Sequence, residues 1–253
     1  MILSFGNSIL DYSGIVLDYQ PSSIVSDSLF MELDASSYSG SGLWLDETAN
    51  GNNATINGAT WSSTDGGLFD FDGINDTISI PHKTSFSLNT TTPKTIQVWV
   101  KYDVLPTSTN RMITFAKLSS AYAFDGYWGG LSGDSRAVIA TNGGSISKTS
   151  DSGASLISLD TWYLYTFISR ITNTAGSTKV YLNTTQYISS FHGTDSYSES
   201  DALTLGYFPA PTAGLGLSVY LNGKIGACYF YTKELSVDEI TTNYNSTKSR
   251  YGL

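Results

Sequence analysis

The sequence predicts an all-β protein, an antiparallel β-sandwich with one short C-terminal helix. Apolar and polar residues alternate in short runs rich in β-branched and aromatic side chains, which is the period of a strand with one buried face. Asp-Gly, Gly-Gly and Asn-Gly pairs separate these runs and favour tight turns. About a dozen short strands at such spacings are typical of a sandwich. Neither βαβ alternation nor a heptad repeat occurs.

Each run gives one expected strand, and a single helix follows the last strand. The helix is expected to begin near Ser236, because Ser236 and Glu239 have the spacing of a capping box. The predicted strands are Leu29–Leu33, Leu68–Phe71, Thr77–Ile80, Thr95–Tyr102, Met112–Lys117, Tyr122–Trp128, Arg136–Ala140, Trp162–Arg170, Thr178–Leu182, Ala202–Leu205, Ser218–Leu221 and Lys224–Tyr231.

One domain is expected to account for most of the chain. With 253 residues, of which 40% are hydrophobic, the chain can bury one large core, and we assign residues 24–253 to it. Residues 1–23 stand apart, and they are either extra strands on the edge of the sandwich or an arm that docks on another subunit. The apolar side chains expected to make the arm's contacts are Leu3, Phe5, Ile9, Leu10 and Val16.

The charge distribution argues against nucleic acid as a partner. The net charge is -9, and residues 1–82 hold 11 of the 22 acidic residues but no Lys or Arg. An acidic chain without a basic cluster binds nucleic acid poorly. We interpret the early acidic excess as a solvated face with turn aspartates. Cation binding and docking to a basic partner are the alternatives.

The sequence shows no sign of membrane insertion or of a disulfide framework. No stretch approaches 18 apolar residues, and the start lacks the positive and apolar profile of a secretory signal. The single cysteine, Cys228, lies in an apolar run and is expected to be buried and inert. We therefore expect a protein that is cytoplasmic before it is assembled into a particle.

Several segments carry a family resemblance when they are taken in order. Residues 33–36 read LDAS, residues 44–61 read WLDETANGNNATINGATW, and residues 68–81 read LFDFDGINDTISIP. The strands around Trp99 and Trp162 follow, and the chain closes with NGKIGACYFY and then LSVDEITTNYN. In this order they resemble laminin G-like domains of the concanavalin A-like lectin/glucanase type. The resemblance implies a jelly-roll sandwich that is a binding or structural scaffold.

The resemblance also bears on metal binding. Such domains often bind calcium in the loop that here holds Asp46, Asn50 and Asn52, and calcium prefers oxygen ligands of these kinds. The late strand of the family usually adds an acid, but here it reads Ile225-Gly226-Ala227. Calcium is thus one expectation for this loop, and a metal-free turn closed by hydrogen bonds is the other.

Catalysis is not expected, and no catalytic residues are assigned. Glucanases of this fold need two carboxylates that flank the scissile bond, on a strand of the form E-x-D-x-E. We find no such strand, so a glucanase-type hydrolase is only the remote alternative.

Aromatic residues beside glycines and prolines suggest a carbohydrate-binding face. Lectin sites use rings and neutral hydrogen-bonding groups on loops. The alternative for these rings is the protein core. The candidates are Tyr122, Asp125, Tyr127, Trp128, Tyr207 and Phe208.

The leading hypothesis is a non-enzymatic virion protein, a capsid decoration or tail-associated protein that displays a lectin-like sandwich at the virion surface. The isolated sandwich, the apolar arm and a closing YNSTKSRYGL that resembles stand-alone phage domains favour it. Its partners are other virion proteins or copies of itself. A carbohydrate-binding lectin module that binds cell-surface glycan is the alternative.

Overall fold

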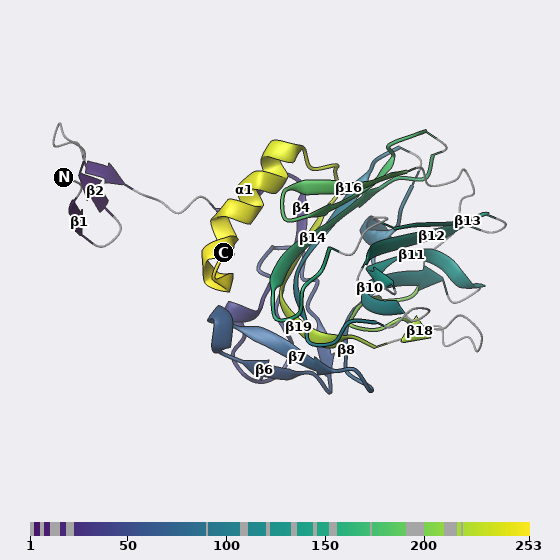
Figure 1. Cartoon of the computed structure of the whole chain (residues 1–253), viewed down its shortest axis with the longest axis horizontal. Helices are drawn as coiled ribbons and strands as arrows, with labels where there is room; N and C mark the ends of the chain where they lie inside the picture. Colours follow the sequence, from purple (N-terminus) through teal and green to yellow (C-terminus); the bar gives the residue numbers. More distant parts are fainter. Residues whose placement is uncertain are drawn as a thin grey trace.

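Two β-sheets pack face to face, and one helix covers the outer side of the second sheet (Figure 1). The computed structural model describes residues 3–5, 8–10, 16–18, 23–89, 91–106, 111–119, 122–132, 136–143, 146–151, 156–172, 174–190, 200–209, 217–218 and 220–253. No helix in these ranges is long and apolar enough to cross a membrane.

We call the sheet that the helix does not cover the front sheet and the helix-covered sheet the back sheet. The front sheet has eight strands, and all its pairings between described residues are antiparallel except that of β18, which runs parallel to β10. In order, the strands are β13 (Ile146–Asp151), β12 (Arg136–Gly143), β11 (Tyr122–Ser132), β10 (Arg111–Ser119), β17 (Leu203–Leu205), β8 (Thr77–Ile80) and β5 (Thr55–Asn57), with β18 (Leu217–Ser218) beside β10.

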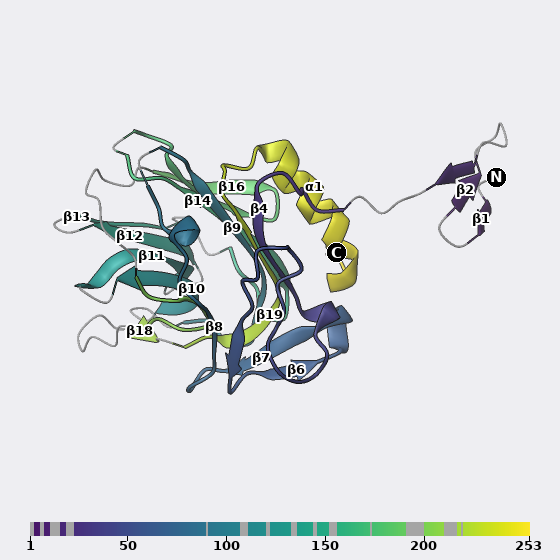
Figure 2. The same cartoon turned by 180° about the vertical axis from the view of Figure 1, so that it is seen from behind.

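The back sheet also has eight strands. One edge of β19 is shared, because β7 pairs with its first residues and β4 with its last. In order, the strands are β16 (Thr185–Ser190), β15 (Thr178–Leu182), β14 (Trp162–Ser169), β9 (Lys94–Tyr102), β19 (Asn222–Tyr231), β7 (Leu68–Asp72) and β6 (Thr60–Ser62), with β4 (Leu29–Asp34) beside β19. Figure 2 shows the two layers from behind.

The central strands of the back sheet, β9 and β19, are buried on both faces, and the protein has two apolar cores. Along β9, Ile96, Val98 and Val100 point into the core between the sheets. Trp99 points the other way, into a second cluster beneath the helix. Trp99 is therefore fully buried, but beneath the helix and not between the sheets.

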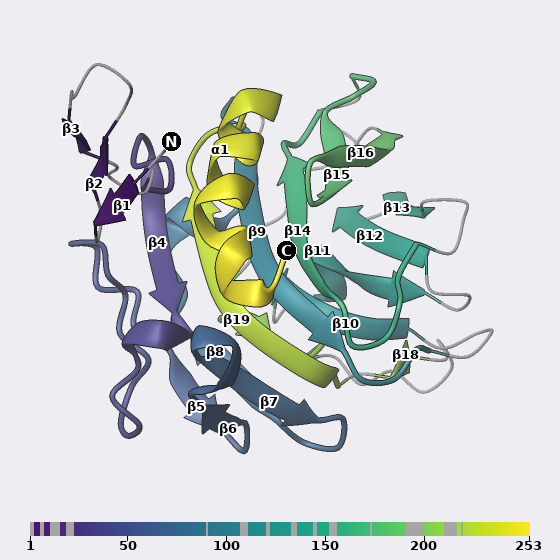
Figure 3. The same cartoon turned by 60° about the vertical axis from the view of Figure 1, so that its left-hand side comes forward.

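The helix α1 (Val237–Thr247) lies across β19 and β9, as Figure 3 shows. The backbone N–H of Glu239 donates to Ser236 Oγ, and the N–H of Ser236 donates to a carboxylate oxygen of Glu239. The predicted capping box is therefore confirmed. Short 3-10 turns complete the described helices: Ala35–Ser37, Thr64–Gly66, Thr84–Phe86 and, after α1, Lys248–Tyr251.

Three further strands near the start form a sheet of their own. In chain order they are β1 (Leu3–Phe5), β2 (Ser8–Leu10) and β3 (Val16–Asp18), and β2 pairs antiparallel with both of the others. Among the described residues they pair with no strand of the sandwich. The side chains of Leu3, Phe5, Ile9, Leu10 and Val16 lie outside what the structure describes, so their role as an arm stays a prediction.

Candidate functional site

Asp46 is the centre of a hydrogen-bonded loop after β4. Its buried carboxylate accepts from the backbone N–H groups of Glu32, Thr48 and Asn52 at 2.8–3.0 Å. The side-chain amides of Asn50 and Asn52 donate to the carbonyl of Phe30. The loop for which calcium was one expectation is thus closed by the protein's own donors.

These residues fit a metal-free turn better than a calcium site. Calcium needs six to eight oxygen ligands. Asn52 Oδ1 is buried without a partner, which is the one feature here that favours a cation. Against it, no three His, Cys, Asp or Glu side chains among the described residues are placed to hold a metal. At Gly226, where the family carries its late acid, an added Cβ would overlap the hydroxyl of Tyr251.

Three of the predicted glycan-binding rings are structural. Tyr127 is 1% exposed, and its hydroxyl donates to the carbonyl of Phe86. Trp128 and Phe208 are also buried and pack edge to face against each other, with ring centroids 6.0 Å apart. Their assignment to a glycan site is therefore wrong, because a buried ring has no face to offer a ligand. Tyr122 and Asp125 lie on β11, and their side chains are outside the described residues.

Tyr207 is a predicted ring that remains accessible, and the structure gives it a partner. It forms an isolated β-bridge with Tyr220, and the two half-buried rings stack with centroids 4.8 Å apart and planes 19° from parallel. Burial, and then the neighbouring phenol of Tyr220, raises the pKa of the Tyr207 hydroxyl. Thr204 Oγ1 donates to the carbonyl of Tyr207, which fixes the backbone of the pair. We call Tyr207 and Tyr220 the tyrosine pair.

Sequence reasoning missed Tyr220. A signal was present, because Tyr207 and Tyr220 flank the segment FPAPTAGLGLSV, whose prolines and glycines favour a chain reversal. A reversal there brings the two tyrosines opposite each other, as in a cross-strand pair.

A groove of about 440 Å³ lies where β4 meets α1 on the helix-covered side of the back sheet. We call it the α1 groove. The segment that precedes β4 forms one wall of this groove, and it is hydrogen-bonded to the helix. The N–H of Val25 donates to Asn243 Oδ1 at 2.7 Å. Its lining residues are Ser23, Ile24, Ser26, Leu29, Glu32, Asp34, Tyr229, Ser246 and Thr247.

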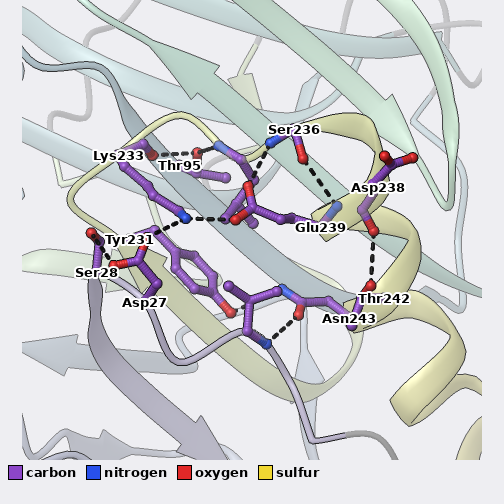
Figure 4. A network of polar contacts seen from close by, with 12 residues as sticks. Asp27, Ser28, Thr95, Tyr231, Lys233, Ser236, Asp238, Glu239, Thr242 and Asn243 are labelled. Carbon is purple, nitrogen blue, oxygen red and sulfur yellow. Dashed lines mark hydrogen bonds and ion pairs between the residues drawn. The ribbon is translucent and has the colours of Figure 1, made fainter.

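Figure 4 shows the polar network that holds the helix beside this groove. Lys233 Nζ contacts carboxylate oxygens of both Asp27 and Glu239 at 2.6 Å. Asn243 Nδ2 donates to the Tyr231 hydroxyl at 2.8 Å and to Gln97 Oε1 at 2.6 Å. These contacts bond the helix to β9 and β19 directly, and to the segment before β4 through Lys233.

Glu32 and Asp34 give the α1 groove its charge. Burial, and then the negative charges of Glu47, Asp34 and Asp46, raises the pKa of the Glu32 carboxyl to about 7. Asp34 forms an ion pair with Arg250 Nη1 at 2.5 Å, so Glu32 is the lining carboxylate that no described cation contacts. Glu32 and Asp34 lie two residues apart and on one face of β4. The sequence did not predict this site, because nothing in the sequence places α1 above them.

The family model for the concanavalin A-like lectin/glucanases superfamily matches residues 72–241. No curated protein sequence matches the chain.

Solved structures with this fold include carbohydrate-binding proteins. Domain 4 of AbnA, an extracellular arabinanase from Geobacillus stearothermophilus, solved in complex with arabinotriose, is similar at a TM-score of 0.62 and 17% identity, over 86% of this chain and 98% of that domain. Botulinum neurotoxin type C, whose cell entry depends on interaction with two ganglioside molecules, is similar at a TM-score of 0.65 and 14% identity, over 87% of this chain and 51% of that one. A Trypanosoma rangeli sialidase reaches a TM-score of 0.64 at 15% identity, over 88% of this chain and 33% of that one.

Because these structures are less than 20% identical to the chain, their similarity establishes the fold alone. The matched segment of the family model covers well over half of the chain and includes most strands of both sheets. The chain therefore belongs to the concanavalin A-like lectin/glucanase superfamily.

Proposed function

We propose that this protein is a non-enzymatic, lectin-type carbohydrate-binding module and that the tyrosine pair is its sugar platform. The observation that carries the proposal is the accessible stack of Tyr207 on Tyr220, beside three predicted rings that are buried. An aromatic face with nearby polar groups binds the C–H face of a sugar and orients its hydroxyls. The arabinotriose and ganglioside ligands named for two structural neighbours support the proposal by analogy.

The test is a glycan array with the whole chain and matched variants. The wild type and Tyr207→Phe, which keeps the ring, should bind the same glycans. Tyr207→Ala should lose most of the signal. Tyr187→Ala is the control, because Tyr187 is 40% exposed on β16, in the other sheet. Equal binding by Tyr207→Ala and the wild type would refute the platform.

The absence of catalysis is a separate part of the proposal. Asp34 is held by Arg250, so it is poorly placed to serve as the second carboxylate that hydrolysis requires. A reducing-sugar assay on the glycans that bind should therefore show no release. Release that disappears in both Glu32→Gln and Asp34→Asn would instead favour a glycosidase at the α1 groove.

The finer proposal places this module on a virion surface, with β1–β3 as its attachment element. It is supported by a small sheet that pairs only with itself among the described strands and by the apolar residues of its sequence. Unsatisfied strand edges gain backbone hydrogen bonds from another chain.

Deletion of residues 1–22 tests this attachment. The truncated protein should melt cooperatively but should no longer form oligomers or enter particles, as measured by light scattering. A truncated protein that fails to fold would show that this segment belongs to the domain itself.

A further inference from the structure

Glu32 is a carboxylate in the α1 groove that lacks a bonding partner. Its side chain is half-buried, yet it forms neither a hydrogen bond nor an ion pair with any described residue. Other acids around the helix are paired: Asp34 with Arg250, and Asp27 and Glu239 with Lys233. A carboxylate that is partly removed from water without a partner is costly, and a cation would relieve that cost.

The surroundings of Glu32 suit a lysine side chain. Ser246 and Thr247 line the groove, and each donates its hydroxyl hydrogen to a carbonyl of α1, so neither hydroxyl hydrogen is directed at an incoming ammonium. Thr247 Oγ1 also accepts from the Nε1–H of Trp99. Ile24 and Leu29 line the same groove and offer apolar surface. Lysine combines a compact ammonium, which seeks several oxygens, with a methylene stem that packs on apolar surface.

Charge complementarity points to the same occupant. Glu47, Asp34 and Asp46 add negative potential at Glu32. The chain preceding the groove cannot neutralise it, because no Lys or Arg occurs before Lys83 and no His before His82. Among the described residues no basic side chain pairs with Glu32, so a cation that pairs with it would come from outside this part of the chain.

We propose that the α1 groove is a docking site for a lysine side chain of a partner protein, with the ammonium at Glu32 and the methylenes along Ile24 and Leu29. Arginine fits less well, because its planar guanidinium needs several acceptors in fixed directions, and Glu32 is the one lining carboxylate that is not already paired with a described residue. Arg250 already occupies Asp34, the second carboxylate of the groove.

Docking at this site depends on pH. The groups that face Glu32 are Asp34 with its partner Arg250 and the acids Asp46 and Glu47, and the phenols of Tyr229 and Tyr231 lie near it on β19. Because the pKa of Glu32 is about 7, a proton competes with the cation at acidic pH. Competition of this kind weakens binding roughly tenfold between pH 8 and pH 6.

The experiment uses the full ¹⁵N-labelled chain and n-butylammonium chloride, which reproduces the lysine side chain, with n-butanol as the neutral control. Addition of n-butylammonium should shift the amide signals of Leu29, Glu32 and Thr247, and n-butanol should not. Glu32→Gln should abolish the effect. Glu47→Gln should keep it, because it removes an exposed neighbouring charge that does not line the groove.

Three results would overturn the proposal. They are equal shifts with n-butanol, shifts that survive Glu32→Gln, and binding by the wild type that is equally strong at pH 6 and pH 8. The pH comparison needs no variant, so it decides the question even if Glu32→Gln folds poorly. Glycan binding through the tyrosine pair is measured separately, and its failure would leave this result standing.

Discussion

Replacement of Trp99 by alanine tests how the helix is attached to the sandwich. The ring is 0% exposed, stacks on Tyr244 at 5.8 Å and packs on Tyr251 at 4.3 Å. Its Nε1–H donates to Thr247 Oγ1 at 2.9 Å. Truncation of a buried Trp to Ala costs about 3–5 kcal/mol, and loss of the hydrogen bond alone costs about 0.5–1.5 kcal/mol. We therefore expect Trp99→Ala to lower the free energy of unfolding by several kcal/mol and Trp99→Phe to lower it much less.

Urea unfolding measures how much each Trp99 variant lowers the free energy of unfolding, and hydrogen exchange shows which backbone amides lose protection. Trp99→Ala should speed exchange at the amides of α1 selectively. Val98→Ala is the matched control, because Val98 is the preceding residue on β9 but faces the core between the sheets. It should reduce stability without selective loosening of α1. A Trp99→Ala protein with unchanged exchange in α1, or one as stable as Trp99→Phe, would refute the placement of this ring.

Three further predictions concern single residues. Gly73 has a φ of +79°, as expected for a turn glycine, and an added Cβ would come within 2.8 Å of Asn222 Cβ. Gly73→Val should therefore lower the free energy of unfolding, measured by thermal unfolding, by about 1–3 kcal/mol. Asp46→Ala should cost about 1–3 kcal/mol because it strands the buried N–H of Asn52, and chelation or addition of calcium should leave the wild-type midpoint unchanged. A midpoint that rises with calcium only when Asp46 is present would favour the metal site instead. The pKa of Glu32 is higher in the native state than in the unfolded chain, so the native state binds this proton more tightly. Glu32 therefore makes the free energy of unfolding fall as the pH rises from 4.5 towards 7. Glu32→Gln should flatten this slope, and an unchanged slope would contradict the raised pKa.

Strands with strong alternation and a marked turn could be predicted from the sequence, and so could the start of the helix. β5 and β6 were missed because each has three residues with mostly polar side chains. β13 and β16 were missed because they are outer strands of the two sheets, with sequences ISKTSD and TQYISS that show little apolar alternation. Edge strands need few buried side chains, so periodicity gives them little signal.

The site was harder to predict because it depends on contacts between distant residues. Both faces of β9 are buried, so alternation could not show that Trp99 packs under α1. The rings of Tyr127 and Phe208 carry the same sequence signal as Tyr207, and only the pairing of strands separates buried rings from an accessible one. Glu32 becomes noteworthy only when the helix closes the groove above it.

The most direct test of carbohydrate binding is chemical-shift mapping with the glycan that gives the strongest array signal. The proposed function predicts the largest changes at Tyr207 and Tyr220 and at their neighbour Thr204, with saturation at rising glycan concentration. Changes confined to the α1 groove or to the Asp46 loop, or no binding to any glycan on the array, would contradict the assignment of the tyrosine pair as the sugar platform.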